Sequence, residues 1–265
     1  MTRTISPSMS VILEQLELER PVVITMEGLT RLLAAHNVQT PARIVAARLR
    51  EKGWLLSTGQ RGVWEFAPAE TAGAYSSNNP LIGLLAYINK YPDVSCGLTF
   101  QAAAWVYGYA DRIPIRPEVA TNKTSVVRTF PSNLSTSVFS PMLSYEFKKD
   151  VPVLARESVI VHMCEKPSAV RSWESALEWM VELITDLSQE KIMRELMPRP
   201  QTVKSRTGYL LKVLRADIAD LIYKEYKPKN KTWFGSRHKL LRHDNKWLIA
   251  DTLLPFDPDR LESEL

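Results

Sequence analysis

Cysteine is scarce in this chain of 265 residues, and no long apolar run occurs in it. Its two cysteines, Cys96 and Cys164, lie far apart, without a CxxC pair or a nearby histidine cluster, so neither a disulfide scaffold nor a zinc site is predicted. We interpret both as ordinary buried thiols. No apolar stretch is long enough to span a bilayer, and the first residues lack the apolar segment of a signal peptide. The sequence therefore predicts a soluble cytoplasmic protein without a membrane partner.

Histidine is also scarce, and its placement does not indicate catalysis. Nucleophilic catalysis needs a nucleophile and a base held together, and four histidines offer few such sets. His238 and His243 are five residues apart, which is a poor spacing for metal ligands on one helical face. Gly235-Ser236 and Asp257-Pro258-Asp259 have the residue types of a nucleotidyltransferase site, but they are widely separated, and the proline would disrupt a strand presenting both carboxylates. We expect no enzyme activity, no metal and no cofactor.

Charge is distributed unevenly along the chain, whose formal net charge is +5. Residues 204–246 hold twelve Lys or Arg and four Asp or Glu, whereas residues 157–195 hold four and eight. The last fifteen residues carry five acids and one base. This asymmetry indicates a basic surface that faces nucleic acid and a separate acidic face.

Residues 8–35 have the pattern of two helices joined by a short strand. The segment 8–19 is predicted to be a helix whose stripe contains Val11, Ile12, Gln15, Leu16 and Leu18. The β-branched run 22–24 favours a small edge strand. Thr25 is expected to cap a second helix over 26–35, with Leu29, Leu32 and Leu33 facing the core.

A third helix is predicted over residues 42–52, ending at Gly53. Thr40-Pro41 offers an N-cap oxygen and a proline suited to the first helical turn. Because Val45 and Leu49 pack inward with Ala42, the opposite side carries Arg43, Ala47 and Arg50. Between residues 40 and 61 there are five basic residues and one acid, so this surface suits phosphates and base edges.

Two strand-like runs, 54–57 and 63–66, follow and are joined by a Gly-flanked tip, which predicts a β-hairpin. Three helices and a hairpin in this order predict a winged helix-turn-helix over about residues 8–67, and with it a sequence-specific DNA-binding protein. The alternative is a winged helix that serves as a protein-interaction module. The predicted DNA-contacting residues are Thr40, Arg43, Ala47, Arg50, Gln60 and Arg61.

The rest of the chain predicts a larger α+β domain. The small, polar, proline-bounded stretch 67–80 is typical of a linker, so we expect domains at 1–75 and 76–265. Helices are predicted over 81–90, 99–107, 168–195, 188–197 and 201–226. Strands are predicted over 119–121, 125–130, 138–139, 143–147, 158–162 and 247–251. Mixed helices and strands in this order make an α+β domain.

A basic stretch at 224–246 is interpreted as either a second DNA-contacting surface or a solvated loop over a packed Trp233-Phe234 pair. The tryptophans Trp105, Trp173, Trp179 and Trp247 lie in apolar settings and are expected in the core. The candidate residues of this second surface are Lys227, Lys229, Lys231, Arg237, Lys239 and Arg242.

Several motifs together resemble the AbiEi antitoxins, the AbiE-type transcriptional regulators of bacterial toxin–antitoxin and abortive-infection loci. They are Leu49-Arg-Glu-Lys-Gly-Trp-Leu-Leu, Arg61-Gly-Val-Trp, the small-residue segment from Val94 to Pro114, Glu118-Val-Ala-Thr-Asn, Ser205-Arg-Thr-Gly-Tyr-Leu-Leu and Trp247-Leu-Ile-Ala-Asp. The resemblance spans about residues 20–255 in the right order, although the family's usual helix after the strands is matched only loosely around 172–177.

The resemblance implies that the N-terminal domain binds inverted repeats in its own promoter and represses the operon. It also implies that the C-terminal domain counters a cognate nucleotidyltransferase-like toxin in phage defence. An alternative from another class is a module that sequesters the toxin by direct contact, through the acidic helices at 174–195.

Overall fold

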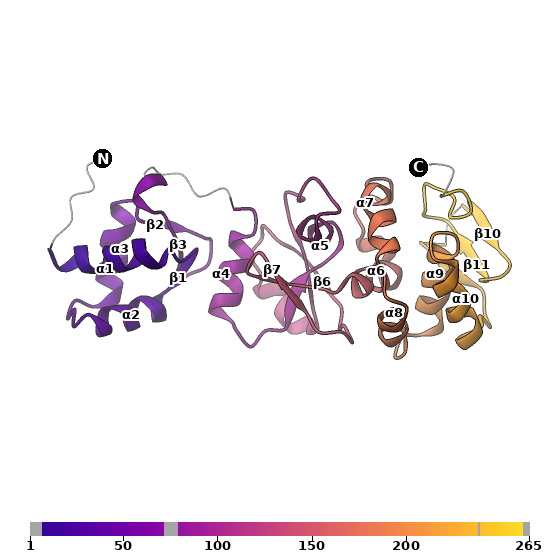
Figure 1. The fold of residues 1–265 in the computed structure, drawn as a ribbon, viewed down its shortest axis with the longest axis horizontal. Coiled ribbons are helices and arrows are strands. Elements are labelled where there is room, and N and C mark those ends of the chain that lie inside the picture. The colour runs from indigo at the N-terminus through magenta and orange to yellow at the C-terminus, as the bar shows by residue number, and fades with distance from the viewer. Residues whose placement is uncertain (1–6, 72–78, 238, 262–265) are drawn as a thin grey trace. The chain divides into compact units, whose positions relative to one another are not determined.

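The computed structural model describes residues 7–71, 79–237 and 239–261. Helices and three sheets make up a mixed α+β structure (Figure 1), as the sequence predicts. Two compact units divide the chain, residues 1–95 with 129–134 and residues 96–128 with 135–265. The predicted linker falls largely on residues 72–78, which lie outside the described residues. The boundary expected near residue 75 stays a prediction. Within the described residues, none of the helices has the length and apolar character needed to span a bilayer.

The first unit contains the three helices and the hairpin that the sequence predicts. A three-stranded antiparallel sheet has the order β1-β3-β2, so β1 is an edge strand and β3 is central. The bounds are α1 (Pro7–Glu19), β1 (Val23–Thr25), α2 (Met26–Ala35), α3 (Ala42–Glu51), β2 (Leu55–Ser57), β3 (Val63–Phe66), the 3₁₀ helix η1 (Ala69–Thr71) and α4 (Ile82–Lys90).

The helix ends of this unit follow local rules, with one correction. The Thr25 hydroxyl accepts a hydrogen bond from the Gly28 N–H at 3.0 Å, which confirms Thr25 as the cap of α2. At the end of α3, Gly53 adopts φ 74° and its N–H bonds to the carbonyl of Arg50, a left-handed helix stop that glycine makes without strain. The N-cap of α3 is Pro41, so Thr40 does not cap this helix. Ala42, rather than the proline, opens the first turn.

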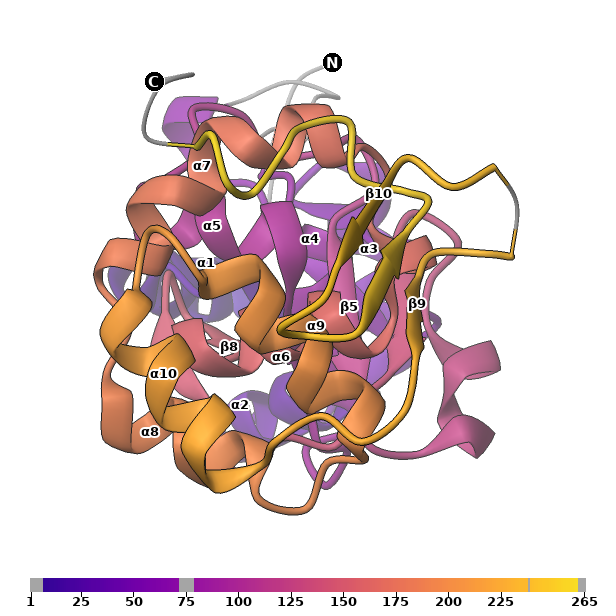
Figure 2. The same ribbon diagram turned by 90° about the vertical axis from the view of Figure 1, so that its right-hand side faces the viewer.

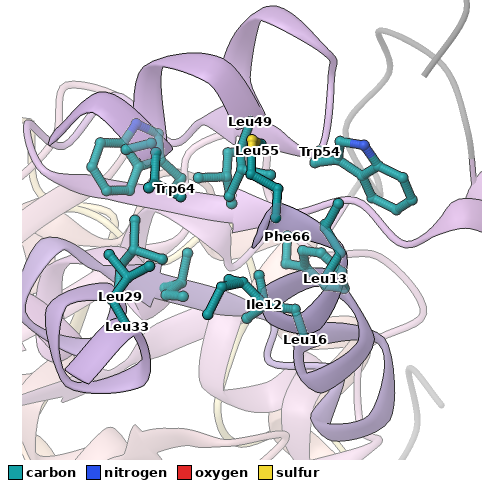
Figure 3. Packing of buried hydrophobic residues seen from close by; sticks show 14 residues of the cluster. Ile12, Leu13, Leu16, Leu29, Leu33, Leu49, Trp54, Leu55, Trp64 and Phe66 are labelled. Atoms are coloured by element: carbon teal, nitrogen blue, oxygen red, sulfur yellow. The ribbon is translucent and has the colours of Figure 1, made fainter. Parts of the chain in front are cut away.

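The core of the first unit is a cluster in which α1, α2 and α3 bury side chains against the sheet (Figure 3). In α1 the predicted stripe is partly wrong, because Val11 and Leu18 are exposed, whereas Met9 and Leu13 are buried. In α3, Val45 and Leu49 are buried as predicted. The labelled members of the cluster are Ile12, Leu13, Leu16, Leu29, Leu33, Leu49, Trp54, Leu55, Trp64 and Phe66.

The second unit is built on a five-stranded mixed sheet of order β6-β5-β4-β8-β7. The pairs β4–β5 and β7–β8 are antiparallel, and β4–β8 and β5–β6 are parallel. Its strands are β4 (Cys96–Leu98), β5 (Glu118–Thr121), β6 (Ser135–Val138), β7 (Glu146–Lys148) and β8 (Val151–Val153).

Helices and a small sheet complete this unit. The small sheet has the order β10-β11-β9 and packs on α9 (Figure 2). The helices are α5 (Phe100–Tyr107), α6 (Arg156–Glu165), α7 (Trp173–Thr185), α8 (Gln189–Leu196), α9 (Gln201–Leu211) and α10 (Ala216–Glu225), and the strands are β9 (Thr232–Phe234), β10 (Arg242–Asp244) and β11 (Ile249–Asp251).

Four predictions in this unit are wrong. The run 158–162 lies in α6, because a helix buried on all sides shows no amphipathic period and its β-branched residues imitate a strand. Residues 125–130 fall mainly in a 3₁₀ helix, Thr124–Thr129. The helix predicted over 201–226 is two helices, α9 and α10. Trp105 is only half-buried, whereas the other three predicted core tryptophans of this unit are buried.

Candidate nucleic-acid interface

A groove of about 770 Å³ lies between α3 and the β2–β3 hairpin of the first unit. It is open to solvent on the exposed side of α3, where residues spaced by four and three share one helical face. Its lining residues are Met26, Arg43, Ala46, Ala47, Arg50, Ser57, Gly59, Gln60, Arg61, Gly62, Val63, Trp64 and Lys90.

Five of the six residues that the sequence singles out for DNA contact meet in this groove. Arg43, Ala47 and Arg50 come from α3 and are exposed, and Gln60 and Arg61 come from the hairpin tip. Thr40 does not line the groove. The roles of all six in DNA contact stay predictions, but their convergence on one concave surface is a property of the fold.

The hairpin tip is held by its own hydrogen bonds. The buried Thr58 hydroxyl donates to the Val63 carbonyl at 2.9 Å and accepts from the Gln60 N–H at 3.3 Å. Gly59 and Gly62 both adopt φ 81°, a left-handed backbone that favours glycine. The Gly62 carbonyl also accepts from the Met26 N–H at 2.8 Å, which ties the tip to the start of α2. Gln60 and Arg61 are therefore presented from a fixed turn.

The groove is strongly basic. Its lining holds four cations, Arg43, Arg50, Arg61 and Lys90, and no carboxylate. None of these four forms an ion pair with a residue that the structure describes. Four uncompensated positive charges around one concave surface produce a potential that attracts a polyanion. Sequence reasoning missed Lys90 because it lies beyond the predicted linker, where no local pattern connects it to the hairpin.

The predicted second basic surface is only partly free. Lys227, Lys229, Lys231, Arg237 and Lys239 are exposed. The guanidinium of Arg242 instead pairs with the fully buried Asp251 at 2.9 Å and also donates to the Leu254 carbonyl. Burial lowers the pKa of Arg242, but the ion pair with Asp251 outweighs it and raises the pKa. The side chain therefore holds the small sheet together and is not free to contact DNA. His238 lies outside the described residues.

The buried titratable groups of the second unit are held in apolar surroundings. His162 is fully buried between the rings of Phe100 and Phe139, and its two ring nitrogens lie 2.9 Å from the Thr99 hydroxyl and 3.2 Å from the Ser137 hydroxyl. Burial lowers the pKa of His162 to about 3, with smaller contributions from two nearby cations. The imidazole is therefore neutral near pH 7 and acts as a structural hydrogen-bonding group.

Both cysteines are free and buried, as predicted. Burial raises the pKa of the Cys96 and Cys164 thiols to about 12, which keeps them protonated and poorly nucleophilic. Over the described ranges, no group of three or more His, Cys, Asp or Glu side chains could hold a metal ion. The Asp259 carboxylate suggested by the nucleotidyltransferase comparison forms an ion pair with Lys212 at 2.6 Å.

An acidic face runs along α7, where acidic residues recur every four positions. Glu174, Glu178 and Glu182 are exposed, and Asp186 continues the row just beyond the helix. Asp186 accepts a hydrogen bond from the Tyr109 hydroxyl. Like charges four apart destabilise an isolated helix by about 0.2–0.5 kcal/mol per pair. The predicted acidic face is a continuous stripe of negative charge along α7, whereas the groove of the first unit is basic.

Comparison with solved structures defines the class of fold. The chain superposes on the crystal structure of the RV2827C protein from Mycobacterium tuberculosis with a TM-score of 0.78 and 21% sequence identity, over 96% of this chain and 94% of the other. The two chains therefore share the fold of both units. Among curated proteins, none matches the sequence at a significant level.

The family follows from the second unit. Residues 94–213 match the AbiEi antitoxin C-terminal domain, and this match begins within two residues of the division between the compact units. The chain therefore contains a region that matches an AbiEi antitoxin domain, and this supports the AbiEi-type family that its sequence motifs indicated. A domain of that family suggests a regulatory role with a toxin as partner.

Proposed function

We propose that residues 7–66 form a winged helix-turn-helix that binds double-stranded DNA, with α3 in the major groove and the β2–β3 hairpin as the wing. The element order and the antiparallel sheet support a winged helix-turn-helix. The observation that carries it is the groove between α3 and the hairpin, which is lined by four cations and no carboxylate. Such a surface matches the phosphate backbone that borders a DNA groove.

Different residues of α3 contact bases and phosphates. Arg43 is the second residue of α3, and the first turn of a recognition helix is the part that reaches base edges, where arginine binds guanine in a bidentate way. Ala47, one turn later, is small enough to let the helix approach and to contact a thymine methyl group. Arg50 near the end of α3 and Arg61 on the wing contact phosphates.

The biological role that fits both units is an autorepressor antitoxin. The DNA site that we propose is an inverted repeat in the protein's own promoter, as the resemblance to the AbiEi antitoxins implies. The second unit, as an AbiEi antitoxin domain, counters a nucleotidyltransferase-like toxin encoded beside it. This role joins DNA binding in the first unit to toxin control in the second.

A mobility-shift assay on a fragment of the protein's own promoter tests the residue assignment. The Arg43→Ala, Arg50→Ala double variant should bind at least about tenfold more weakly than the wild type, because a bidentate arginine–guanine contact is worth about 1–3 kcal/mol. Arg20→Ala is the matched control, since Arg20 is an exposed arginine of the same unit that pairs with Glu70 and does not line the groove. Undiminished binding by the double variant would refute the assignment.

A second candidate function is direct neutralisation of the toxin by the acidic face of α7. The exposed carboxylates at 174, 178 and 182 favour it, because they form a row of negative charge that a basic surface of a partner can neutralise. Co-purification of a stable complex with the neighbouring gene product supports this function if Glu178→Lys, Glu182→Lys abolishes the complex. A complex that survives this double reversal excludes the acidic face as its binding surface.

A further inference from the structure

The helix α4 lies outside the predicted winged helix in sequence but belongs to the first compact unit. It packs against β1 and β3, an edge strand and the central strand of the three-stranded sheet of this unit. Lys90, the last residue of α4, lines the groove together with Arg43, Arg50 and Arg61. The end of α4 therefore forms a third side of the basic groove, in addition to α3 and the β2–β3 hairpin.

An aromatic cluster fixes the end of α4. The buried ring of Tyr87 stacks on Phe130 with centroids 4.0 Å apart and lies 5.0 Å from the ring of Tyr91. The Tyr87 hydroxyl is 2.6 Å from the hydroxyl of Thr129, so the segment 129–134 supports this helix from a distant part of the chain. The Lys90 ammonium lies 5.2 Å above the centre of the Tyr91 ring, a cation–π arrangement that limits where it can go.

The charge of Lys90 has no anionic partner among the described residues, and the other groove cations have none either. The other charged residues that line the groove are Arg43, Arg50 and Arg61, all positive. Lysine is a compact point charge that binds phosphate well and lacks the planar fork with which arginine pairs bidentately. The position and the chemistry of Lys90 both match a backbone phosphate next to the wing.

We infer that α4 is part of the DNA interface and that Lys90 contacts a phosphate beside the wing, as a fourth cationic contact of the groove. This inference rests on the proposed DNA-binding function and extends it beyond the three helices and the hairpin. The alternative is that Lys90 only offsets the negative end of the α4 dipole. The two readings differ in how DNA affinity depends on salt.

The test measures DNA affinity of the full chain as a function of salt, between about 50 and 300 mM, by fluorescence anisotropy on a promoter duplex and on a scrambled duplex. Each phosphate contact adds about 0.9 to the slope of log K against log salt, so Lys90→Gln should lower the slope by about that amount. Affinity at about 0.15 M salt should fall by roughly fivefold, and equally on both duplexes, since a phosphate contact carries no sequence information. Lys90→Arg should keep the wild-type slope.

Arg20→Gln is the matched control, because it removes one exposed positive charge from the same unit at a position outside the groove. A Lys90→Gln slope equal to that of the wild type, while Arg43→Ala still weakens promoter binding, overturns the inference and leaves the proposed function intact. Failure of the wild type to bind the promoter duplex more tightly than the scrambled one overturns the proposed function itself. A lowered melting temperature with an unchanged slope assigns Lys90 to the helix dipole and also overturns the inference.

Discussion

Burial shifts the pKa values of two side chains of the second unit in opposite directions. His162 is fully buried, and its pKa falls from about 6.5 to about 3, chiefly by burial and further by Lys166 and Arg199. Glu118 is 4% exposed, and burial raises its pKa from about 4.5 to about 7, although the Ala102 N–H at 3.1 Å and the charge of Arg171 oppose the rise. Both groups are therefore uncharged in the native state near pH 6.

Linkage fixes the sign and the size of each contribution. The unfolded chain protonates His162 as pH falls through about 6.5 while the native state does not, so between pH 7 and 5 this residue destabilises the fold by about 2 kcal/mol. The native state protonates Glu118 before the unfolded chain does, so over the same range this residue stabilises the fold by about 2 kcal/mol. In the wild type these two contributions nearly cancel.

Substitution separates the two contributions. Relative to the wild type, His162→Gln should gain about 2 kcal/mol of unfolding free energy between pH 7 and 5, and Glu118→Gln should lose about 2 kcal/mol. Urea unfolding of the three proteins at both pH values, followed by circular dichroism, measures these differences. The glutamine side chains keep hydrogen-bonding atoms at both sites. A loss of stability from altered packing is the same at both pH values, so it cancels in the difference. Variants that follow the wild-type pH dependence would refute the assignment of buried neutral side chains.

Three further predictions concern packing, ion pairing and capping. Gly208→Ala should destabilise the second unit by about 1–3 kcal/mol in thermal unfolding, because a Cβ on this residue would lie 2.0 Å from the Trp247 ring; a small effect would contradict this packing. Arg199→Met should cost about 3–5 kcal/mol in urea unfolding, since it leaves the fully buried Glu195 carboxylate without its cationic partner; a loss below about 1 kcal/mol would contradict this. Thr25→Ala should cost about 1 kcal/mol, measured by the same unfolding, with DNA affinity unchanged at a temperature where the variant is folded.

The first unit was largely predictable from the sequence because local signals define it. Thr25, Gly53 and the glycines of the hairpin tip each set a helix or strand end through bonds to near neighbours. The spacing of Arg43, Ala47 and Arg50 places them on one helical face whatever lies beyond it. Five of six predicted contact residues consequently line one groove.

The features that sequence reasoning missed depend on long-range contacts. The strand β4 pairs in parallel with β8, more than fifty residues away, and such short buried strands carry no alternating pattern. The helix α6 is buried all round, so it shows no polar face. Lys90 reaches the groove only because Phe130 and Thr129 return to support α4. Gly208 and the Trp247 ring are distant in sequence but lie against each other in the fold, and neither motif alone indicates this contact.

The central claim is that the basic groove of the first unit recognises one DNA sequence. The most direct measurement is the ratio of dissociation constants for a promoter duplex and a scrambled duplex of equal length, at the same salt concentration of about 0.15 M. We expect the promoter duplex to bind at least about a thousandfold more tightly, as specific regulators do. Equal dissociation constants for the two duplexes would contradict it.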